Sequence, residues 1–548
     1  MTIYLGSYWV ALQVIDFFIQ KFGINIFWVK AFSVGGLCLV PSLILFAWFR
    51  FQKGWWYKQL FFYLINSAII VYVLLGMNKD TFDQKNADSV AEKSVAILPF
   101  ENLSGDPSQE YFSDGISEEI LNALTQIKDL KVPGRASSFR FKHQTMDLQE
   151  IGEKLRVNNV LDGSVRKQGN RVRVKVELVS VKDGYRIWSQ QFDRTLDDVF
   201  AIQEEIARTV TAKLKVTLFQ NEIFDVAEVF AKNKEAYDAF LKGRYFWNKR
   251  SLKESEKYYK EAIALDSGYA AAYAGLAENY ALFPGSGLAS PLQAIQMTHE
   301  AANKAIQLDS MMAMPYLALA FVKCNYEWNN AEAKRYFKKA LELNSRYAPI
   351  HYWFGQFLAI QEQNYDSAIK EMNRAVELEP LEPAAHLFRG IALSFAGKYK
   401  DALKALSFCV ELNKQINVAY MFMGHCYLSM NQITKATELY EQSAKLGSQQ
   451  SVAILVLCYL KQGKKEKAEK QLASLVEYSK TNNVSPFSLA LAYSFLDQKE
   501  QAHLALKKSF EAHEQWIIII NNSPSPWPVE KLKSDPRNME LGKEYLKK

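Results

Sequence analysis

Residues 96 to 120, AILPFENLSGDPSQEYFSDGISEEI, have the residue types and the spacing of a catalytic loop. An apolar run that predicts a buried strand leads into glycine and aspartate, and a helical pattern follows. A strand, a glycine loop and a helix start are a common cradle for phosphate. Four carboxylates could also hold a metal ion or activate a water molecule, namely Asp106, Asp114, Glu118 and Glu119.

The individual motifs do not favour a catalytic, phosphate-binding or metal-binding site. A phosphate loop needs G-x-x-x-x-G-K-[ST] or G-x-G-x-x-G, and no lysine follows Gly105 or Gly115 in this sequence. Glu118 and Glu119 are neighbours on one predicted helix, so they point in different directions. Asp114 stands where that helix, 114–126, is predicted to begin, which is the position of an N-cap. We therefore favour a structural cap over an active site, and we predict no catalytic residue, no cofactor and no metal site.

Composition and cysteine spacing point the same way. The chain has 548 residues and a formal net charge of +7, without the block of lysine and arginine that a nucleic-acid site needs. Its five cysteines form no C-x-x-C pair, and an odd number does not favour a disulfide framework. We therefore expect no nucleic-acid partner and buried, unreactive thiols.

The elements around the candidate loop predict a small α/β domain over residues 94–218. Gly169 and Gly184 lie between alternating runs such as RVRVKVELVSV, and tight hairpin turns of this kind require positive φ. The expected order is strand 94–100, helix 114–126, strand 129–133, helix 147–156, strands 157–166, 170–181 and 185–193, and helix 199–218.

The first 77 residues predict a membrane anchor with three transmembrane helices. Ala31–Phe49 and Leu60–Met77 are long and uncharged enough to cross a bilayer, and Ile3–Ile19 is a third apolar stretch. The loop 50–58 is basic and aromatic, so the positive-inside rule places it in the cytoplasm and the rest of the chain outside. Residues 78–93 are polar and without periodicity, which predicts a linker.

A repeated unit follows the α/β domain over residues 234–515. Its closing motifs, such as KKALELN and NRAVELE, end in leucines that recur at intervals of 34 or 35 residues after a longer first interval. These leucines are Leu265, Leu308, Leu343, Leu378, Leu412 and Leu446. A period of 34 indicates tetratricopeptide repeats, of which we expect about eight, with residues 516–548 as a C-terminal cap.

Repeats of this kind stack into a solenoid with a concave groove. By register, the groove is expected to present an apolar and aromatic surface to an extended or helical peptide. The predicted partner groove consists of Tyr352, Gln356, Leu387, Ile391, Phe395, Met421 and His425. The alternative is that the groove packs against another part of the same chain.

Two segments also resemble a known family. SVAILPFENLSGDPSQEYFSDGISEEILNAL and VLDGSVRKQGNRVRVKVELVSVKDGYRIWSQQFDR resemble the TolB-like (FlgO-like) domain, and YWVALQVIDFFIQKFGI resembles the membrane anchors found with it. The resemblance implies a bacterial inner-membrane, multi-pass protein with periplasmic C-terminal domains. It also implies that the α/β domain is not catalytic and that tetratricopeptide repeats follow it.

The predicted fold class is therefore multidomain: transmembrane α-helices, a small TolB-like α/β domain, and an all-α repeat solenoid. We predict a non-enzymatic, membrane-anchored scaffold or signalling protein that binds protein or peptide partners through the repeat groove. Two alternatives stay open. One is a sensory or regulatory subunit that acts with a separate output protein, and the other is an enzyme with an unrecognised site in the α/β domain.

Overall fold

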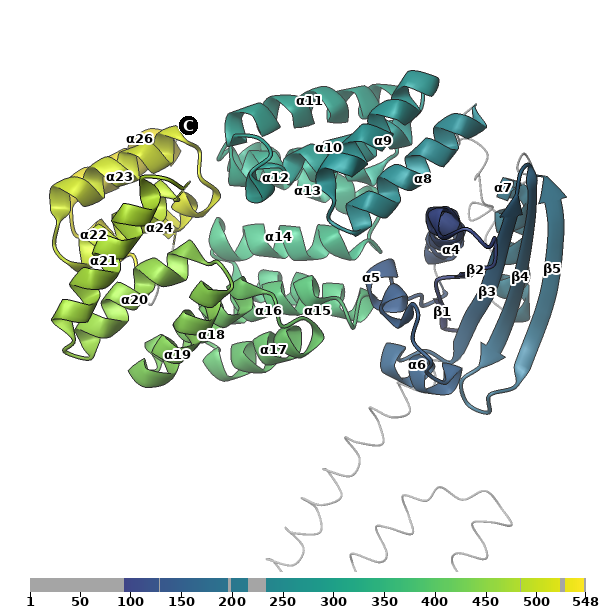
Figure 1. Cartoon of the computed structure of the whole chain (residues 1–548), viewed down its shortest axis with the longest axis horizontal. Helices are drawn as coiled ribbons and strands as arrows, with labels where there is room; N and C mark the ends of the chain where they lie inside the picture. Colours follow the sequence, from purple (N-terminus) through teal and green to yellow (C-terminus); the bar gives the residue numbers. More distant parts are fainter. Residues whose placement is uncertain are drawn as a thin grey trace, which may run out of the picture. The chain divides into compact units, whose positions relative to one another are not determined.

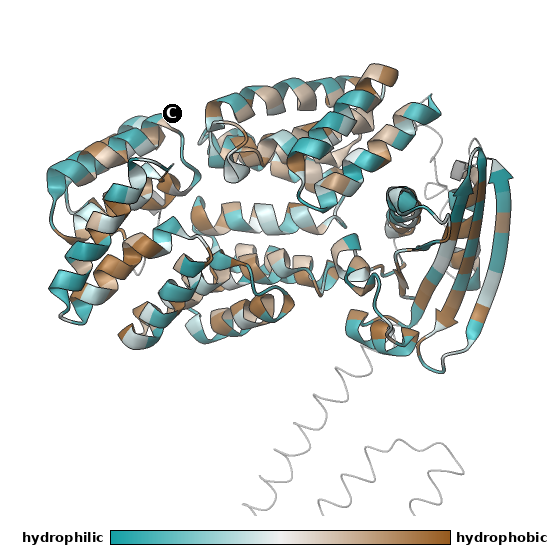
Figure 2. Cartoon of the chain, in the orientation of Figure 1, coloured by the Kyte–Doolittle hydropathy of each residue, from teal (hydrophilic) through white to brown (hydrophobic). Residues whose placement is uncertain are grey.

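The computed structural model describes residues 93–127, 129–195, 199–214, 233–482, 484–522 and 528–546. A small α/β region comes first, and paired helices follow it to the end of the described chain (Figure 1). Hydrophobic and hydrophilic residues alternate along the paired helices, as they do in helices with one buried face (Figure 2).

The sheet of the α/β region is built on three long antiparallel strands. Its strands are β1 (Val95–Ile97), β2 (Glu101–Asn102), β3 (Asn159–Gln168), β4 (Arg171–Ser180) and β5 (Arg186–Thr195). The order is β1-β3-β4-β5, with β1 and β2 parallel to β3 and the remaining pairs antiparallel. In this register Val165, Val174 and Phe192 lie side by side on the buried face. Alternation of polar and apolar residues along β4 therefore gives the sheet one buried face and one wet face.

Helices cover the buried face of the sheet and its edge. They are α4 (Glu110–Thr125), α5 (Arg135–Ser138), α6 (Leu148–Leu155) and α7 (Val199–Lys213). The predicted hairpin strands agree with β3, β4 and β5, and Gly169 and Gly184 have φ of 58° and 72°. The predicted strand 129–133 is reduced to a single bridge between Ser94 and Lys131.

The prediction that Asp114 caps a helix beginning there is wrong. Helix α4 begins at Glu110, so Asp114 lies within the helix and pairs with Lys142. The aspartate that acts as a cap is Asp106, whose side chain accepts a hydrogen bond from Ser108 N at the short 3-10 turn before α4. The first turn of the helix was missed because Glu110 and Tyr111 carry no start signal of their own.

Sixteen helices follow between Lys234 and Glu511, and they pack as consecutive antiparallel pairs. The pairs are α8 (Lys234–Asn248) with α9 (Leu252–Leu265), α10 (Ala270–Ala281) with α11 (Pro291–Leu308), α12 (Ala313–Asn325) with α13 (Asn330–Leu343), α14 (Ala348–Ile360) with α15 (Tyr365–Leu378), α16 (Pro383–Phe395) with α17 (Tyr399–Leu412), α18 (Asn417–Ser429) with α19 (Ile433–Lys445), α20 (Gln449–Lys461) with α21 (Lys465–Ser479), and α22 (Pro486–Phe495) with α23 (Lys499–Glu511).

Small residues set how closely the two helices of a pair approach. A Cβ atom added to Gly390 of α16 would lie 2.5 Å from Leu406 Cγ of α17. Any larger residue at this position would force the helices apart, because the pair is already packed at the density of a protein core. The chain then ends in a short 3-10 helix η7 (Gln515–Ile518) and in α24 (Ile519–Asn522), α25 (Glu530–Lys533) and α26 (Pro536–Leu546).

The structure corrects the transmembrane part of the predicted fold class. Within the described ranges, no helix combines the length and the apolar character that crossing a bilayer requires. Helix α11 has 18 residues but carries Glu300 and Lys304, because one face of each repeat helix meets water. This finding contradicts the predicted transmembrane fold class, the membrane-integral character and the multi-pass inner-membrane location. The three spans predicted within residues 1–77 lie outside the described residues.

Candidate functional site

The candidate site is the face formed by the first helices of the pairs. Contacts join α10 to α12, α12 to α14, α14 to α16, α16 to α18, and further along α20 to α22, so neighbouring first helices form an inner layer. The second helices pack behind them. We call the exposed side of this layer the inner face, because stacked helix pairs curve around the surface of their first helices.

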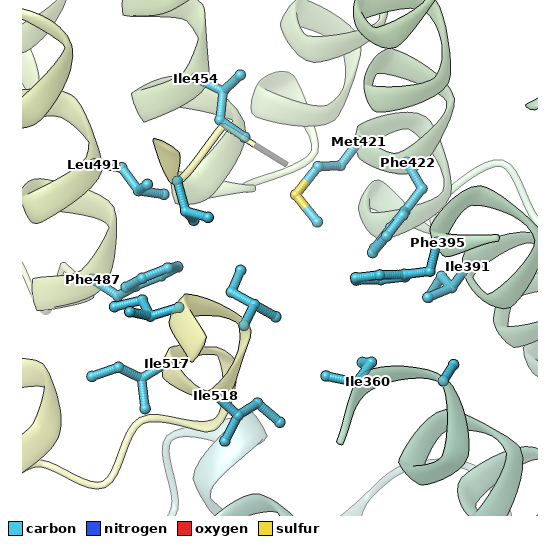
Figure 3. Close-up of a cluster of buried hydrophobic side chains, with 14 of the residues drawn as sticks. Ile360, Ile391, Phe395, Met421, Phe422, Ile454, Phe487, Leu491, Ile517 and Ile518 are labelled. Atoms are coloured by element: carbon cyan, nitrogen blue, oxygen red, sulfur yellow. The ribbon is translucent and has the colours of Figure 1, made fainter. Parts of the chain in front are cut away.

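Part of the inner face is filled by an apolar segment from the end of the same chain. Ile517, Ile518, Ile519 and Ile520 are between 0% and 3% exposed, and they belong to the hydrophobic core of the repeats. Figure 3 shows Ile517 and Ile518 in one cluster with Ile391, Phe395 and Met421. We call residues Ile517–Ile520 the isoleucine segment.

Three of the seven predicted groove residues, Ile391, Phe395 and Met421, therefore lie together against the isoleucine segment (Figure 3). Tyr352 is buried and stacks on Phe388, with ring centroids 5.2 Å apart. Gln356 is buried too, and Leu387 packs at the margin of the same core. Partner binding through these residues stays a prediction.

The seventh residue, His425, lies between the two helices of its own pair. Its Nδ1 atom is 2.6 Å from the hydroxyl of Tyr440 on α19, and the imidazole packs edge-on against the Tyr440 ring. Burial lowers the pKa of His425 to about 3, so the ring is neutral at physiological pH. This histidine joins the two helices of its pair, and its predicted role in partner binding stays a prediction.

A second contact joins the repeats to the α/β region, and it is polar. Glu118 of α4 accepts hydrogen bonds from Arg135 Nε at 2.8 Å and from Arg244 Nη2 of α8 at 2.8 Å. Asn248 Nδ2 donates to the same carboxylate at 3.1 Å. Burial opposes ionisation, but the two guanidinium groups hold the pKa of Glu118 below its usual value.

Glu379, in the turn before α16, makes the next part of this contact. Its carboxylate accepts the backbone N–H groups of Ala136 at 3.1 Å and Ser137 at 2.8 Å, at the start of α5. Burial, with Glu382 nearby, raises the pKa of Glu379 to about 7. A Cβ atom added to Gly134 would lie 2.1 Å from Glu379 Oε1, so the approach requires glycine.

Arg346, in the turn before α14, completes the contact at the end of α4. Its Nη1 atom donates to the carbonyl oxygens of Thr125, Ile127 and Leu130 at 3.1, 2.6 and 2.8 Å. A guanidinium at a helix C-terminus satisfies carbonyls that have no partner within the helix and complements the helix dipole. We call the contacts made by Glu118, Arg244, Arg346 and Glu379 the polar junction.

The two regions also share an apolar core. Ile116 and Leu124 of α4, Ile206 of α7, and Phe240 and Leu241 of α8 belong to one hydrophobic cluster that includes the buried face of the sheet. The α/β region and the first repeats are therefore packed as one body, and the polar junction fixes their register within it.

The carboxylates of the suspected catalytic loop are used in this packing. Asp106 caps its turn, Asp114 pairs with Lys142, and Glu118 takes part in the polar junction. No group of three or more His, Cys, Asp or Glu suited to a metal ion lies within the described residues. Cys324, Cys409, Cys426 and Cys458 are buried free thiols whose pKa values are raised by burial.

The sequence predicted residues 516–548 as a cap of the repeats and left open a groove that packs against its own chain, but it singled out neither the polar junction nor the isoleucine segment. Arg244, Arg346 and Glu379 stand at different offsets within their repeats, so no periodic pattern marks them. The run of four isoleucines in a mostly polar tail was the available signal. Four consecutive apolar residues point in all directions around a helix and require walls on every side.

Comparisons with known proteins agree with this architecture. Residues 91–209 match the family described as "HilA/YgeH-like transcriptional regulator, second domain". Residues 239–269, 329–383, 358–407 and 418–446 match families described as "Tetratricopeptide repeat". The repeats are tetratricopeptide repeats. A fold of this type serves in general as a scaffold for protein–protein interaction.

Two curated relatives share part of the chain. "Putative adenylate cyclase 3" of Rhizobium meliloti is 38% identical over 189 residues, which are 34% of this chain and 32% of that protein. "Transcriptional regulator HilA" of Salmonella typhimurium is 21% identical over 342 residues, which are 62% of this chain and 60% of that protein. The chain thus spans about a third of one relative and three fifths of the other.

A solved structure of a tetratricopeptide repeat protein from Parabacteroides merdae is among those similar to this chain. It is 17% identical, covers 50% of this chain and 100% of its own, and superposes with a TM-score of 0.34.

Proposed function

We propose that this chain is a non-enzymatic scaffold or signalling protein that binds protein partners through the inner face of its tetratricopeptide repeats. The observation that carries the proposal is the isoleucine segment. An inner face that buries four consecutive isoleucines of a short helical segment has the apolar walls that helix-in-groove recognition uses. The resemblance of residues 94–218 to the TolB-like domain supports a role outside catalysis.

The carboxylates that could do chemistry support the same proposal. A general acid or base must face a substrate, whereas Asp114 and Glu118 face cations within the fold. Glu119 is the remaining carboxylate, and burial raises its pKa to about 7 beside Glu118. The relative named as a putative adenylate cyclase shares only 32% of its length with this chain, so cyclase activity is tested directly. Purified chain with ATP and Mg²⁺ is expected to form no cyclic AMP, and formation above a boiled control would favour an enzyme.

A second candidate is a regulatory subunit that acts with a separate output protein. The match of residues 91–209 to a domain of transcriptional regulators, together with the partial match to a protein named as a cyclase, favours it. In this proposal the polar junction couples the α/β region to the repeats. A change in the α/β region then alters how the inner face binds the output protein.

Photo-crosslinking tests the scaffold proposal. p-Benzoylphenylalanine replaces Phe395 or Tyr352 in the cells that naturally produce the chain, and the aromatic side chains at these positions make the replacement mild. Lys404 on α17, whose side chain is 81% exposed, is the matched control outside the inner face. We expect intermolecular products from the two inner-face positions and none from position 404. Products that link only to peptides of this chain would contradict partner binding through the inner face.

A further inference from the structure

The isoleucine segment is buried on all sides by the repeats. Residues advance by about 120° each in the 3-10 helix η7 and by about 100° each in α24, so four consecutive isoleucines point around the whole circumference of the segment. All four are nevertheless between 0% and 3% exposed. One flat surface could not cover them, so the segment must lie between walls.

The first helices of five successive pairs supply these walls, as Figure 3 shows. Each contributes at least one buried aliphatic or thioether side chain: Ile360 of α14, Ile391 of α16, Met421 of α18, Ile454 of α20 and Leu491 of α22. Phe395, Phe422 and Phe487 complete the lining. These side chains offer the segment apolar area.

Among the described residues, polar contacts are found just before the segment. His513 Nδ1 lies 2.7 Å from the carbonyl oxygen of Tyr326, and its ring stacks on Trp328 with centroids 4.6 Å apart. Gln515 Nε2 donates to Asn325 Oδ1 at 3.0 Å. These contacts tie the segment to the end of α12, almost two hundred residues earlier in the chain.

The flanks of the segment also have anchors outside it. Before it, α23 packs on α22. After it, α26 is held on α23 by Asn538 with His503 and by Arg537 with Glu500. Helix α26 also contacts α24, so departure of the segment breaks that contact, while the contacts that hold α26 on α23 remain. A single turn of helix is not stable alone, so the walls are what keep this segment folded.

We propose that the isoleucine segment is an internal ligand, and that a protein partner of this chain displaces it with a short helix carrying adjacent isoleucine or leucine side chains. The inference rests on the proposed function and names the chemistry of its partner. The segment itself shows which chemistry the walls accept. Because it is tethered at both ends, its effective concentration is high, and it lowers the apparent affinity for any competitor.

A peptide of this chain is the probe for the test. Residues 513–522, HEQWIIIINN, are synthesised with three added lysines for solubility and a fluorescein label, and binding is followed by anisotropy. The full chain is compared with the double variant Ile517→Asp/Ile519→Asp, in which two buried charges expel the segment. We expect the double variant to bind the peptide at least tenfold more tightly than the unaltered chain.

Two further variants locate the binding. Met421→Glu, added to the double variant, places a charge on the wall and is expected to abolish peptide binding. Leu504→Asp in the unaltered chain changes a leucine of α23 that is 56% exposed, and it is expected to leave peptide affinity unchanged. Equal peptide affinity of the double variant and the unaltered chain, or binding that survives Met421→Glu, would overturn the proposal.

Hydrogen exchange of the unaltered chain keeps the test decisive if the double variant does not fold. Excess unlabelled peptide is expected to speed exchange of amides 515–522 while those of α16 and α18 stay protected. Unchanged exchange at a saturating peptide concentration would overturn the proposal. A dimer seen by light scattering, with each copy's segment in the other's walls, would overturn it in favour of a second copy. These measurements need no cellular partner, so they can fail while the crosslinking succeeds, or the reverse.

Discussion

The repeats hold two other parts of the same chain, and they do so with opposite chemistry. The polar junction fixes the α/β region with buried charges and backbone hydrogen bonds, in particular Glu118 with Arg244 and Glu379 with the start of α5. The isoleucine segment is held by apolar contact and by a few polar anchors at one end. Directional contacts specify a single register, whereas apolar walls accept any segment of suitable shape. The polar junction therefore favours one fixed arrangement of the two regions, whereas we infer that the isoleucine segment can be exchanged for another.

Arg244→Ala should produce the largest effect, because it breaks the polar junction at its most buried pair. The substitution removes one guanidinium from Glu118 and leaves Glu278 with the Tyr347 hydroxyl in place of an ion pair, and both carboxylates are buried. Removing one member of a buried pair costs about 3–5 kcal/mol. Urea denaturation should show this loss in the free energy of unfolding.

The control for this variant is Arg335→Ala, which removes an exposed pair with Glu332 on the repeat surface. An exposed ion pair contributes little to stability, so the urea midpoint of Arg335→Ala should stay close to that of the unaltered chain. Equal losses of unfolding free energy in Arg244→Ala and Arg335→Ala would mean that the buried ion pair stabilises the protein no more than the exposed pair does.

Ile518→Ala should have the next largest effect on the free energy of unfolding. Unlike the loss caused by breaking an ion pair, this loss should not depend on the salt concentration. Truncation of a buried isoleucine costs about 2–5 kcal/mol when the site cannot relax. The loss should fall at the lower end, because the segment can open locally without unfolding the repeats. Denaturation in low and in 1 M salt should give the same difference, since no charge is involved. A salt-dependent difference would show that the segment is held by its polar anchors instead.

Glu379 should make the polar junction sensitive to pH. Its folded pKa of about 7 is raised above the ordinary glutamate value near 4.5, so its stabilising contribution is complete below about pH 4.5. That contribution is lost as pH rises through about 7, with a slope of at most about 1.4 kcal/mol per pH unit. Stability measured between pH 5 and 8 should fall less steeply in Glu379→Gln. A Glu379→Gln variant whose profile matches the unaltered chain would show that Glu379 stays ionised throughout.

Arg537→Ala should give the smallest effect. Arg537 pairs with Glu500, whose side chain is 80% exposed, and with Asp535 two residues away. Water competes for the exposed pair with Glu500, and the buried Asp535 keeps its place beside the N-terminus of α26. The thermal midpoint should stay within the error of the measurement, and the peptide affinity of the double variant should not change. A clear drop would mean that α26 depends on this pair and that the segment's two flanks are not independent.

Local pattern made much of the fold predictable. The turns at Gly169 and Gly184 require positive φ, and the strands on either side agree with β3, β4 and β5 to within about two residues. The 34-residue period placed the helix pairs, since each repeat carries its own apolar stripe.

The wrong predictions concern residues whose local sequence pattern is overridden by a contact with a distant part of the chain. Asp114 reads as a helix cap, yet it lies within α4 because Lys142 from a later turn neutralises it there. The stretch 129–133 reads as a strand, yet only Lys131 bridges to Ser94, and Arg346 of a distant repeat takes the nearby carbonyl of Leu130. The seven groove residues were found by register alone, and register does not show what covers them.

By itself, the sequence determined the repeats, the hairpin strands and the absence of a phosphate-loop motif, because each depends on residues close together in the chain. Tertiary structure alone decided the partners of Glu118 and Glu379 and the place of the isoleucine segment. Glu118 and Arg244 are 126 residues apart, and His513 meets Tyr326 across 187. No local propensity encodes such contacts. They arise only when stacked repeats bring distant turns together and bury charge beside charge and isoleucine against the inner face.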